Sequence, residues 1–526
     1  MASRMIRSAL LAALAHGAAV GTAAGAADSP TVTPASGGAG VPLVFGHFED
    51  VEAIGYETAE FFVSGDAHSY TTGVPLTPDG QWDAVAPNPT TAAYETRVVA
   101  HRPTEAERFN GTVFVEWLNV SGGVDASPDW VHGHLEVARQ GAAYVLVSAQ
   151  FVGVDQLKNG SPLAPGDPDR YGSLVHPGDS YSYDIFSQAG QAIWDGGVLG
   201  GLVPLRVLAL GESQSAGRLV TYIDAVQPLV DVYDGFVVHS RSAGGSPLSQ
   251  GPLPSIPVSN ADIRADLGVP VIVFQAESDV AFSALLARQP ETPDGNFRLW
   301  EVAGTAHFDV YGLTIGLLDT GDGQGEIENF EALQDPPSNP APGLIECARP
   351  INAGPMHWVF NAAVHWINRW AEWGTPPPIA PRLEAASAPG VSPVEFALDA
   401  YGNALGGIRT PFVDVPIAKL TGTGNSGAPG GPPTSAFCFL FGQTVPFTAP
   451  ELEALYPDPE SFALAYLFAT LDAVDSLFLL LPDGVALVRA AATVPEPSGS
   501  VLTGTALLAL GCMVRRTRSA SRSRSG

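Results

Sequence analysis

Short apolar runs alternate with longer mixed segments through the central part of the chain. Each run has the length of a strand, and most are followed by polar or glycine-rich turns. Nearly continuous apolar strands separated by helical segments are typical of a parallel sheet covered by helices on both faces. The pattern therefore predicts an α/β fold with a mostly parallel central sheet. The six runs are residues 113–118, 143–148, 205–210, 235–239, 269–275 and 297–303.

Further segments before, between and after these runs complete the predicted core. Residues 56–70 and 93–101 have the pattern of antiparallel strands that often begin such a sheet. Helices are expected at 215–226 and 356–373, where apolar residues recur at helical spacing. Glycine and three prolines follow the second helix and form a strong stop signal. We assign residues 44–381 to this core.

A C-terminal extension, residues 382–493, follows the core and is expected to pack on it. Its composition is rich in glycine and proline, which predicts many turns. We expect one helix in it, residues 460–473, which begins just after Pro459, a residue favoured in the first turn of helices.

Composition narrows the class of protein. The chain has 526 residues, with 54 acidic and 25 basic side chains and a net charge of −29. An acidic balance argues against nucleic acid as a partner, since binding to phosphates needs a basic surface. Hydrophobic residues make up 45% of the chain, enough for a substantial core. Three cysteines without CxxC spacing indicate neither a disulfide scaffold nor a zinc site.

The N-terminus has the charge order of a secretory signal peptide. Arg4 and Arg7 precede an uncharged stretch rich in alanine and leucine, residues 8–23. The small residues Ala24 and Ala26 then offer a cleavage site for signal peptidase. We expect residues 1–26 to be a signal peptide and residues 27–43, rich in Pro, Gly, Ser and Thr, to be a linker.

The C-terminus combines a short proline motif, an apolar stretch and a basic cluster. A Val-Pro-Glu-Pro-Ser motif precedes an uncharged stretch, residues 499–514, and a cluster of five arginines. This order resembles the PEP-CTERM sorting signal. In proteins with this signal, an exosortase-type processing enzyme of Gram-negative bacteria is thought to cut near the motif. We expect residues 494–518 to form the sorting segment, with a transmembrane helix as transient inner-membrane anchor, and residues 519–526 to form a basic tail. The final location would be the cell surface or extracellular matrix. A plain tail anchor is the alternative.

Removal of the two predicted terminal segments would make the remaining protein more acidic and leave it with two cysteines. The remaining body, residues 27–493, has 18 basic and 53 acidic residues, a net charge of −35. Of the three cysteines, Cys347 and Cys438 remain. In an oxidising compartment these two residues, 91 positions apart, could form a disulfide.

A candidate nucleophile lies where a predicted strand turns into a predicted helix. Ser213 follows the strand directly, with Gly211 two positions before it and Ser215 two positions after it. Small residues at these positions are needed because the sharp turn brings their side chains together. The usual second residue is glycine, so Ser215 is a departure. Ser215 is itself an alternative nucleophile, with Gly217 two positions after it.

The order of later residues predicts a catalytic triad. A serine hydroxyl needs a general base, and the base needs an orienting carboxylate. Asp279 follows the strand 269–275, and His307 follows the strand 297–303, which is the chain order serine, acid, histidine of α/β-hydrolases. Glu277 is an alternative acid.

An oxyanion hole is expected from the backbone N–H of Gln214 and an N–H of the loop after strand 113–118. Asn119 begins this loop, which also contains Gly122 and Gly123. Asn119 is a candidate donor, or else an amide that orders the loop.

Through these residues and several further motifs, the chain resembles the bacterial α/β-hydrolase domain family of large, mostly uncharacterised proteins. The resemblance covers roughly residues 44–491 and implies an α/β-hydrolase fold in which Ser213, Asp279 and His307 form the triad. The motifs that carry it are Glu116-Trp117-Leu118-Asn119-Val120, Arg170-Tyr171-Gly172-Ser173-Leu174, His176-Pro177-Gly178-Asp179, residues 210–218, His239-Ser240-Arg241, residues 304–307 and Gly406-Gly407-Ile408-Arg409-Thr410-Pro411.

Other polar clusters are weaker candidates. His132 and His134 could meet on a metal, but no third ligand is evident, and the acidic run 319–326 lacks the spacing of a calcium loop. We expect a solvated acidic loop there, and neither metal nor cofactor. Arg241 and Arg409 could bind a substrate carboxylate or form internal salt bridges.

The sequence thus predicts an exported serine hydrolase, most simply a carboxylesterase that works through an acyl-enzyme. Peptidase, lactonase or thioesterase activity would use the same residues. A non-catalytic surface or matrix protein that keeps the fold is the competing class. Export suggests an ester of the cell envelope or of a polysaccharide as substrate.

Overall fold

The computed structural model describes residues 27–264, 266–387 and 391–493. The predicted signal peptide, sorting segment and basic tail lie outside these residues. Within the described part of the chain, no helix is long and apolar enough to cross a membrane.

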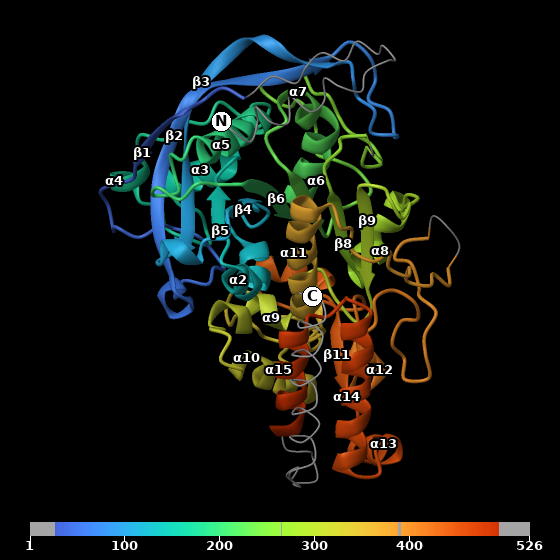
Figure 1. Ribbon diagram of the computed structural model, residues 1–526. Helices are drawn as coiled ribbons and strands as arrows, with labels where there is room; N and C mark the ends of the chain where they lie inside the picture. Colours follow the sequence, from blue (N-terminus) through green and yellow to red (C-terminus); the bar gives the residue numbers. More distant parts are fainter. Residues whose placement is uncertain (1–26, 265, 388–390, 494–526) are drawn as a thin grey trace, which may run out of the picture.

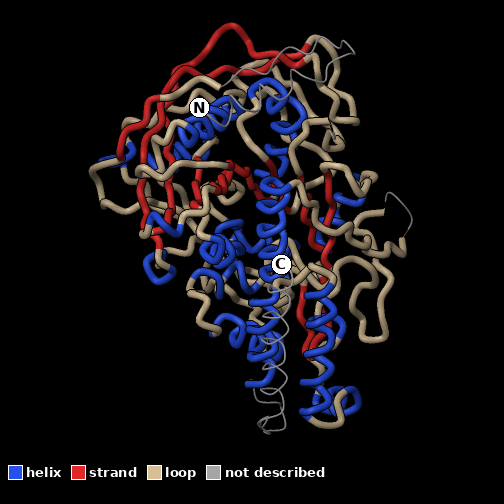
Figure 2. The backbone as a smooth tube through the Cα atoms, in the orientation of Figure 1, coloured by secondary structure: helices blue, strands red, loops and turns tan. Residues whose placement is uncertain are grey.

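A nine-stranded sheet with the order β1-β2-β3-β5-β4-β6-β7-β8-β9 forms the centre of the molecule (Figures 1 and 2). Strands β4 to β9 are parallel to one another, whereas β1, β2 and β3 join the sheet in antiparallel pairings. The predicted α/β fold is therefore present. The strands are β1 (Thr31–Pro34), β2 (Tyr56–Thr72), β3 (Val85–Pro103), β4 (Thr112–Trp117), β5 (Ala143–Val147), β6 (Arg206–Glu212), β7 (Gly235–His239), β8 (Val271–Ala276) and β9 (Phe297–Val302).

Helices cover both faces of the parallel part of the sheet, which explains why strands β4 to β9 are almost entirely buried. Alternate residues of β4 belong to different hydrophobic clusters, since Val113 and Val115 pack with α5 and α6 while Phe114 packs with α2 and α11. The helices of the core are α2 (Pro128–Gln140), α3 (Phe151–Asn159), α4 (Pro168–Tyr171), α5 (Ser182–Trp194), α6 (Gln214–Thr221), α7 (Gln227–Val230), α8 (Glu277–Phe282), α9 (Val310–Leu313), α10 (Gln324–Gln334) and α11 (Met356–Trp373).

The predicted linker, residues 27–43, is in part a strand. Within it, β1 pairs antiparallel with β2 and forms one edge of the sheet. The prediction was wrong here because β1 has only four residues and the composition around it is typical of turns.

The C-terminal extension contains more regular structure than expected. Besides α14 (Pro459–Asp475), which covers the predicted helix, it holds α12 (Pro411–Asp414), α13 (Ala449–Leu455), α15 (Leu481–Thr493) and the hairpin of β10 (Ala418–Thr421) with β11 (Gln443–Pro446). In Figure 1, α14 and α15 lie together at one end of the molecule. Phe412 and Leu420 share a hydrophobic cluster with Val280 and Val310, so the extension packs on the core.

A disulfide joins Cys347 and Cys438, and both cysteines are buried. It ties the segment after α10 to the extension, across 91 residues of sequence. We expect a double Cys→Ala variant to lose up to about 4–5 kcal/mol of unfolding free energy, because the unfolded chain is no longer cross-linked. Denaturant unfolding of the oxidised protein and the variant measures this difference. Equal midpoints, or two free thiols in the isolated protein, would contradict it.

Candidate active site

A sharp turn between β6 and α6 holds Ser213. Its backbone has φ +60° and ψ −113°, a left-handed conformation that is uncommon for residues other than glycine. A Cβ atom on Gly211 would lie 3.2 Å from the Cβ atom of Ser215, so position 211 has little room for a side chain. The turn has the geometry of a nucleophile elbow and tolerates serine in place of the second glycine.

The structure brings Ser213, His307 and Asp279 together at the carboxyl ends of three parallel strands. The Ser213 Oγ atom lies 2.8 Å from His307 Nε2, and His307 Nδ1 lies 2.5 Å from Asp279 Oδ1. The other carboxylate oxygen of Asp279 accepts hydrogen bonds from the Ser240 hydroxyl and the Ala276 N–H, both at 2.7 Å. These bonds hold the carboxylate in line with the imidazole ring.

The two alternative residues have other partners. Ser215 is fully buried, and its hydroxyl donates to the Leu118 carbonyl oxygen at 3.1 Å. Glu277 accepts hydrogen bonds from the N–H of Gly304 at 2.5 Å and the N–H of Gly422 at 2.9 Å. Glu277 thus connects the loop that carries His307 to the C-terminal extension.

Glu212, which the sequence analysis did not single out, belongs to this group. Its Oε1 atom lies 3.0 Å from His307 Nε2, the nitrogen that also faces Ser213. Its Oε2 atom accepts a hydrogen bond of 3.0 Å from Asn119 Nδ2. The signal available in the sequence was an acidic residue directly before the candidate nucleophile, but the direction of its side chain depends on the fold.

Burial and neighbouring charges shift the pKa values of both His307 and Glu212. Burial raises the pKa of Glu212 to about 8, although His307 opposes the shift. Burial alone would lower the pKa of His307, but the carboxylates of Glu212 and Asp279 outweigh it and raise this pKa to about 9. The imidazole therefore holds its second proton more tightly than an ordinary histidine.

Asn119 is not free to act as the predicted oxyanion donor. Its backbone N–H donates to the Ala126 carbonyl oxygen, and its side-chain amide donates to the carbonyl and carboxyl oxygens of Glu212. We correct its role to that of a loop-ordering amide. Within the part of the chain that the structure describes, no atom accepts a hydrogen bond from the backbone N–H of Gln214, Val120 or Gly122.

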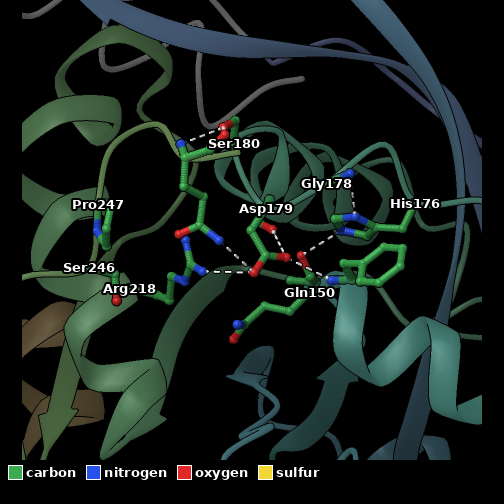
Figure 3. A network of polar contacts seen from close by, with 12 residues as sticks. Gln150, His176, Gly178, Asp179, Ser180, Arg218, Ser246 and Pro247 are labelled. Atoms are coloured by element: carbon green, nitrogen blue, oxygen red, sulfur yellow. Dashed lines mark hydrogen bonds and ion pairs between the residues drawn. The ribbon is translucent and has the colours of Figure 1, made fainter. Parts of the chain in front are cut away.

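A buried polar network anchors the segment between β5 and α5 to the helix that follows Ser213. Figure 3 shows the Asp179 carboxylate facing the guanidinium of Arg218, which lies on α6. Their closest atoms are 3.0 Å apart, and Asp179 also accepts the backbone N–H of Phe151 at 2.8 Å. The His176-Pro177-Gly178-Asp179 motif thus has a structural role beside the elbow.

The two candidate arginines are engaged within the protein. Arg241 is buried and donates to the backbone carbonyl oxygens of Ser242, Ala243 and Ala261. Arg409 forms ion pairs with Asp399 at 2.8 Å and Asp414 at 2.6 Å. Their side chains hold loops in place.

The candidate metal ligands form part of the core. His132 and His134 are buried on α2, and His134 Nε2 lies 2.7 Å from the Asp319 carbonyl oxygen. The acidic run 319–326 was predicted to be a solvated loop, and this prediction was wrong in part. Asp319 and Glu326 are buried, and Asp319 accepts a hydrogen bond from the Tyr311 hydroxyl. In the part of the chain that the structure describes, no three such side chains are grouped to hold a metal ion.

Several solved structures are similar to this chain at low sequence identity. The rice cell wall degrading esterase LipA from Xanthomonas oryzae is 8% identical over 52% of this chain and 90% of its own, with a TM-score of 0.27. The methylesterase BT1017 is 16% identical over 52% of this chain and 48% of its own, with a TM-score of 0.25. A putative dienelactone hydrolase from Klebsiella pneumoniae is 12% identical over 41% of this chain and 73% of its own, with a TM-score of 0.21.

The family comparison covers most of the chain. No curated protein matches the sequence. A model described as "Alpha/beta hydrolase domain" matches residues 23–489, which include the sheet, the elbow at Ser213 and nearly all of the C-terminal extension. The chain therefore belongs to this α/β-hydrolase domain family.

Proposed function

We propose that this protein is a serine hydrolase that cleaves carboxylic esters through an acyl-enzyme. The observation that carries the proposal is the chain of short contacts from Ser213 through His307 to Asp279, with the serine on a nucleophile elbow. A hydroxyl, an imidazole and a carboxylate in this order have the geometry needed to activate a serine.

In the proposed reaction, His307 Nε2 accepts the proton of Ser213 while Oγ attacks the ester carbonyl carbon. The oxyanion that forms is held by the N–H of Gln214 at the start of α6, together with an N–H of the Val120–Gly122 loop. The imidazolium, oriented by Asp279, then protonates the departing alkoxide. A water molecule, deprotonated by His307, hydrolyses the acyl-enzyme and restores Ser213.

An ester is the substrate class we favour. An alkoxide is a better leaving group than an amide anion, so cleavage of an ester depends less on full protonation of the leaving group by His307. Peptides, lactones and thioesters would use the same residues, and a panel of p-nitrophenyl esters of different acyl lengths, with matching anilides and thioesters, separates these classes.

Labelling with a fluorophosphonate probe tests whether Ser213 is an activated nucleophile. We expect the folded protein to be labelled, the Ser213→Ala variant to lose all labelling, and the Ser215→Ala variant to keep it, since Ser215 contacts Leu118 instead of His307. Intact-protein mass spectrometry measures the modification. A folded wild-type protein that is not labelled would favour a non-catalytic surface protein with this fold.

We further propose that the protein acts after export, on an ester of the cell envelope or of a polysaccharide. The basic and apolar pattern of the N-terminus supports export, as does the Cys347–Cys438 disulfide, because disulfides persist mainly in oxidising compartments. Signal peptidase and an exosortase-type enzyme would process the two ends. Free thiols at both cysteines in protein isolated from its host would contradict this location.

A further inference from the structure

Glu212 brings a second carboxyl group to the imidazole that serves Ser213. Asp279 contacts Nδ1 of His307, whereas Glu212 lies 3.0 Å from Nε2 at the other side of the ring. Ser213 Oγ lies 2.8 Å from the same Nε2 atom. The serine and Glu212 therefore share one nitrogen, which can hold one proton at a time.

The position of Glu212 is fixed by its surroundings. The residue is 4% exposed, ends strand β6 and directly precedes the elbow. Asn119 donates to both its backbone oxygen and its Oε2 atom, which leaves Oε1 directed at His307. Within the described residues, its ion-pair partner is His307 alone.

Several other titratable groups face this pair. On α2, Asp129 and His132 lie near Glu212, and His239 on β7 lies near His307. Asp279 faces the pair from the other side of the imidazole, and the carboxylates of Asp129 and Asp279 oppose the negative charge of Glu212. Burial and these carboxylates raise the pKa of Glu212, while Glu212 and Asp279 together raise the pKa of His307. The Glu212–His307 pair therefore retains a proton into alkaline pH.

That proton matters for the reaction, because a protonated Nε2 cannot accept the hydrogen of Ser213. Once it leaves, Nε2 is free to act as the base. When Ser213 transfers its proton, the resulting imidazolium lies between two carboxylates, which stabilise its charge. The proton then goes to the leaving alkoxide, and Glu212 is unchanged over the cycle.

We propose that Glu212 is a positioning residue of the hydrolytic reaction, which holds His307 from the side opposite Asp279 and makes turnover depend on loss of the proton shared by Glu212 and His307. This inference rests on the proposed function. It differs from a purely structural role, in which Glu212 would only anchor Asn119 and would leave the pH dependence of turnover unchanged.

The pH profile of kcat and kcat/KM from about pH 5 to 10.5 tests the proposal, with the best p-nitrophenyl ester as substrate. For the wild type we expect activity to rise with pH through a midpoint well above 6.5, the usual value for histidine. In Glu212→Gln and Glu212→Ala, loss of the negative charge lowers the affinity of His307 for its proton. The rise should therefore move to lower pH by about 1–3 units.

The plateau value of kcat at high pH is a second measurement that tests the proposal. The plateau kcat of both neutral variants should fall roughly tenfold or more, since the imidazolium loses one of its carboxylates. KM should change little, and the loss should be smallest near pH 6. Glu212→Asp keeps the charge and should retain most of the alkaline midpoint. Glu326→Gln removes another buried acid, located on α10, and serves as the control with an unchanged midpoint.

The outcomes separate this inference from the proposed function. One contrary result is a wild type that is labelled by the fluorophosphonate at Ser213 but whose activity rises near pH 6.5. The other is that both neutral variants fold and keep the wild-type midpoint. Either result would show that Glu212 does not have this role, while the proposal of a serine hydrolase would be unaffected. A wild type that is neither labelled nor active refutes the proposed function itself. Because the wild-type midpoint needs no variant, misfolding of a variant does not leave the proposal undecided.

Discussion

Replacement of His307 with alanine is expected to reduce kcat by about 10⁴- to 10⁶-fold, because Ser213 then lacks its general base. His307 Nε2 lies 2.8 Å from Ser213 Oγ, whereas the carboxyl group of Glu212 contacts His307 and Asn119. The rate of p-nitrophenyl ester hydrolysis at saturating substrate measures the effect.

The control for this variant is His365→Ala. His365 lies on α11, is 31% exposed and pairs with Glu136, away from the elbow. We expect it to keep near wild-type kcat. A His307→Ala variant that folds and loses less than tenfold in kcat would rule out the proposed base.

Asp279→Asn is expected to lower kcat by about 10⁴-fold while leaving the fold intact. An asparagine amide can donate to Nδ1 of His307, which would leave the ring in the wrong tautomer to accept from Ser213. Circular dichroism and thermal unfolding check the fold, and kcat measures the loss.

Glu277→Gln is the matched comparison, since Glu277 is the other acid of the same turn. Its carboxylate accepts the N–H groups of Gly304 and Gly422, and a glutamine can accept only one of them. We expect a loss of about 1–3 kcal/mol in stability and a much smaller change in kcat. If Glu277→Gln showed the 10⁴-fold loss and Asp279→Asn did not, the acid of the triad would be Glu277.

The sequence was sufficient to predict the parallel strands of the sheet and the residues that meet at their carboxyl ends. Strands β4 to β9 are apolar on both faces, and such runs are visible without a structure. Ser213, Asp279 and His307 each follow one of these strands. Since parallel strands end at the same edge of a sheet, residues far apart in the chain were expected to meet there.

The contacts of single polar side chains were beyond sequence reasoning. Glu212 ends a strand, and only the packing of Asn119 against it turns its carboxyl toward His307. Asn119 was a candidate oxyanion donor because its loop was recognisable, but its hydrogen bonds depend on residues 93 positions away. Strand β1 was missed because an edge strand of four residues has no periodicity to detect.

The contact between Glu277 and Gly422 has a consequence for how this protein can be divided. The groups of the proposed triad all precede residue 310, yet the loop that bears His307 is held by Glu277 and Asn352, and both contact the 421–422 segment of the extension. A recombinant fragment that ends at residue 381 would contain every group of the proposed triad and lack the contacts that hold the loop of His307. If the proposed function is correct, the extension is part of the smallest catalytic unit and is not an exchangeable accessory module.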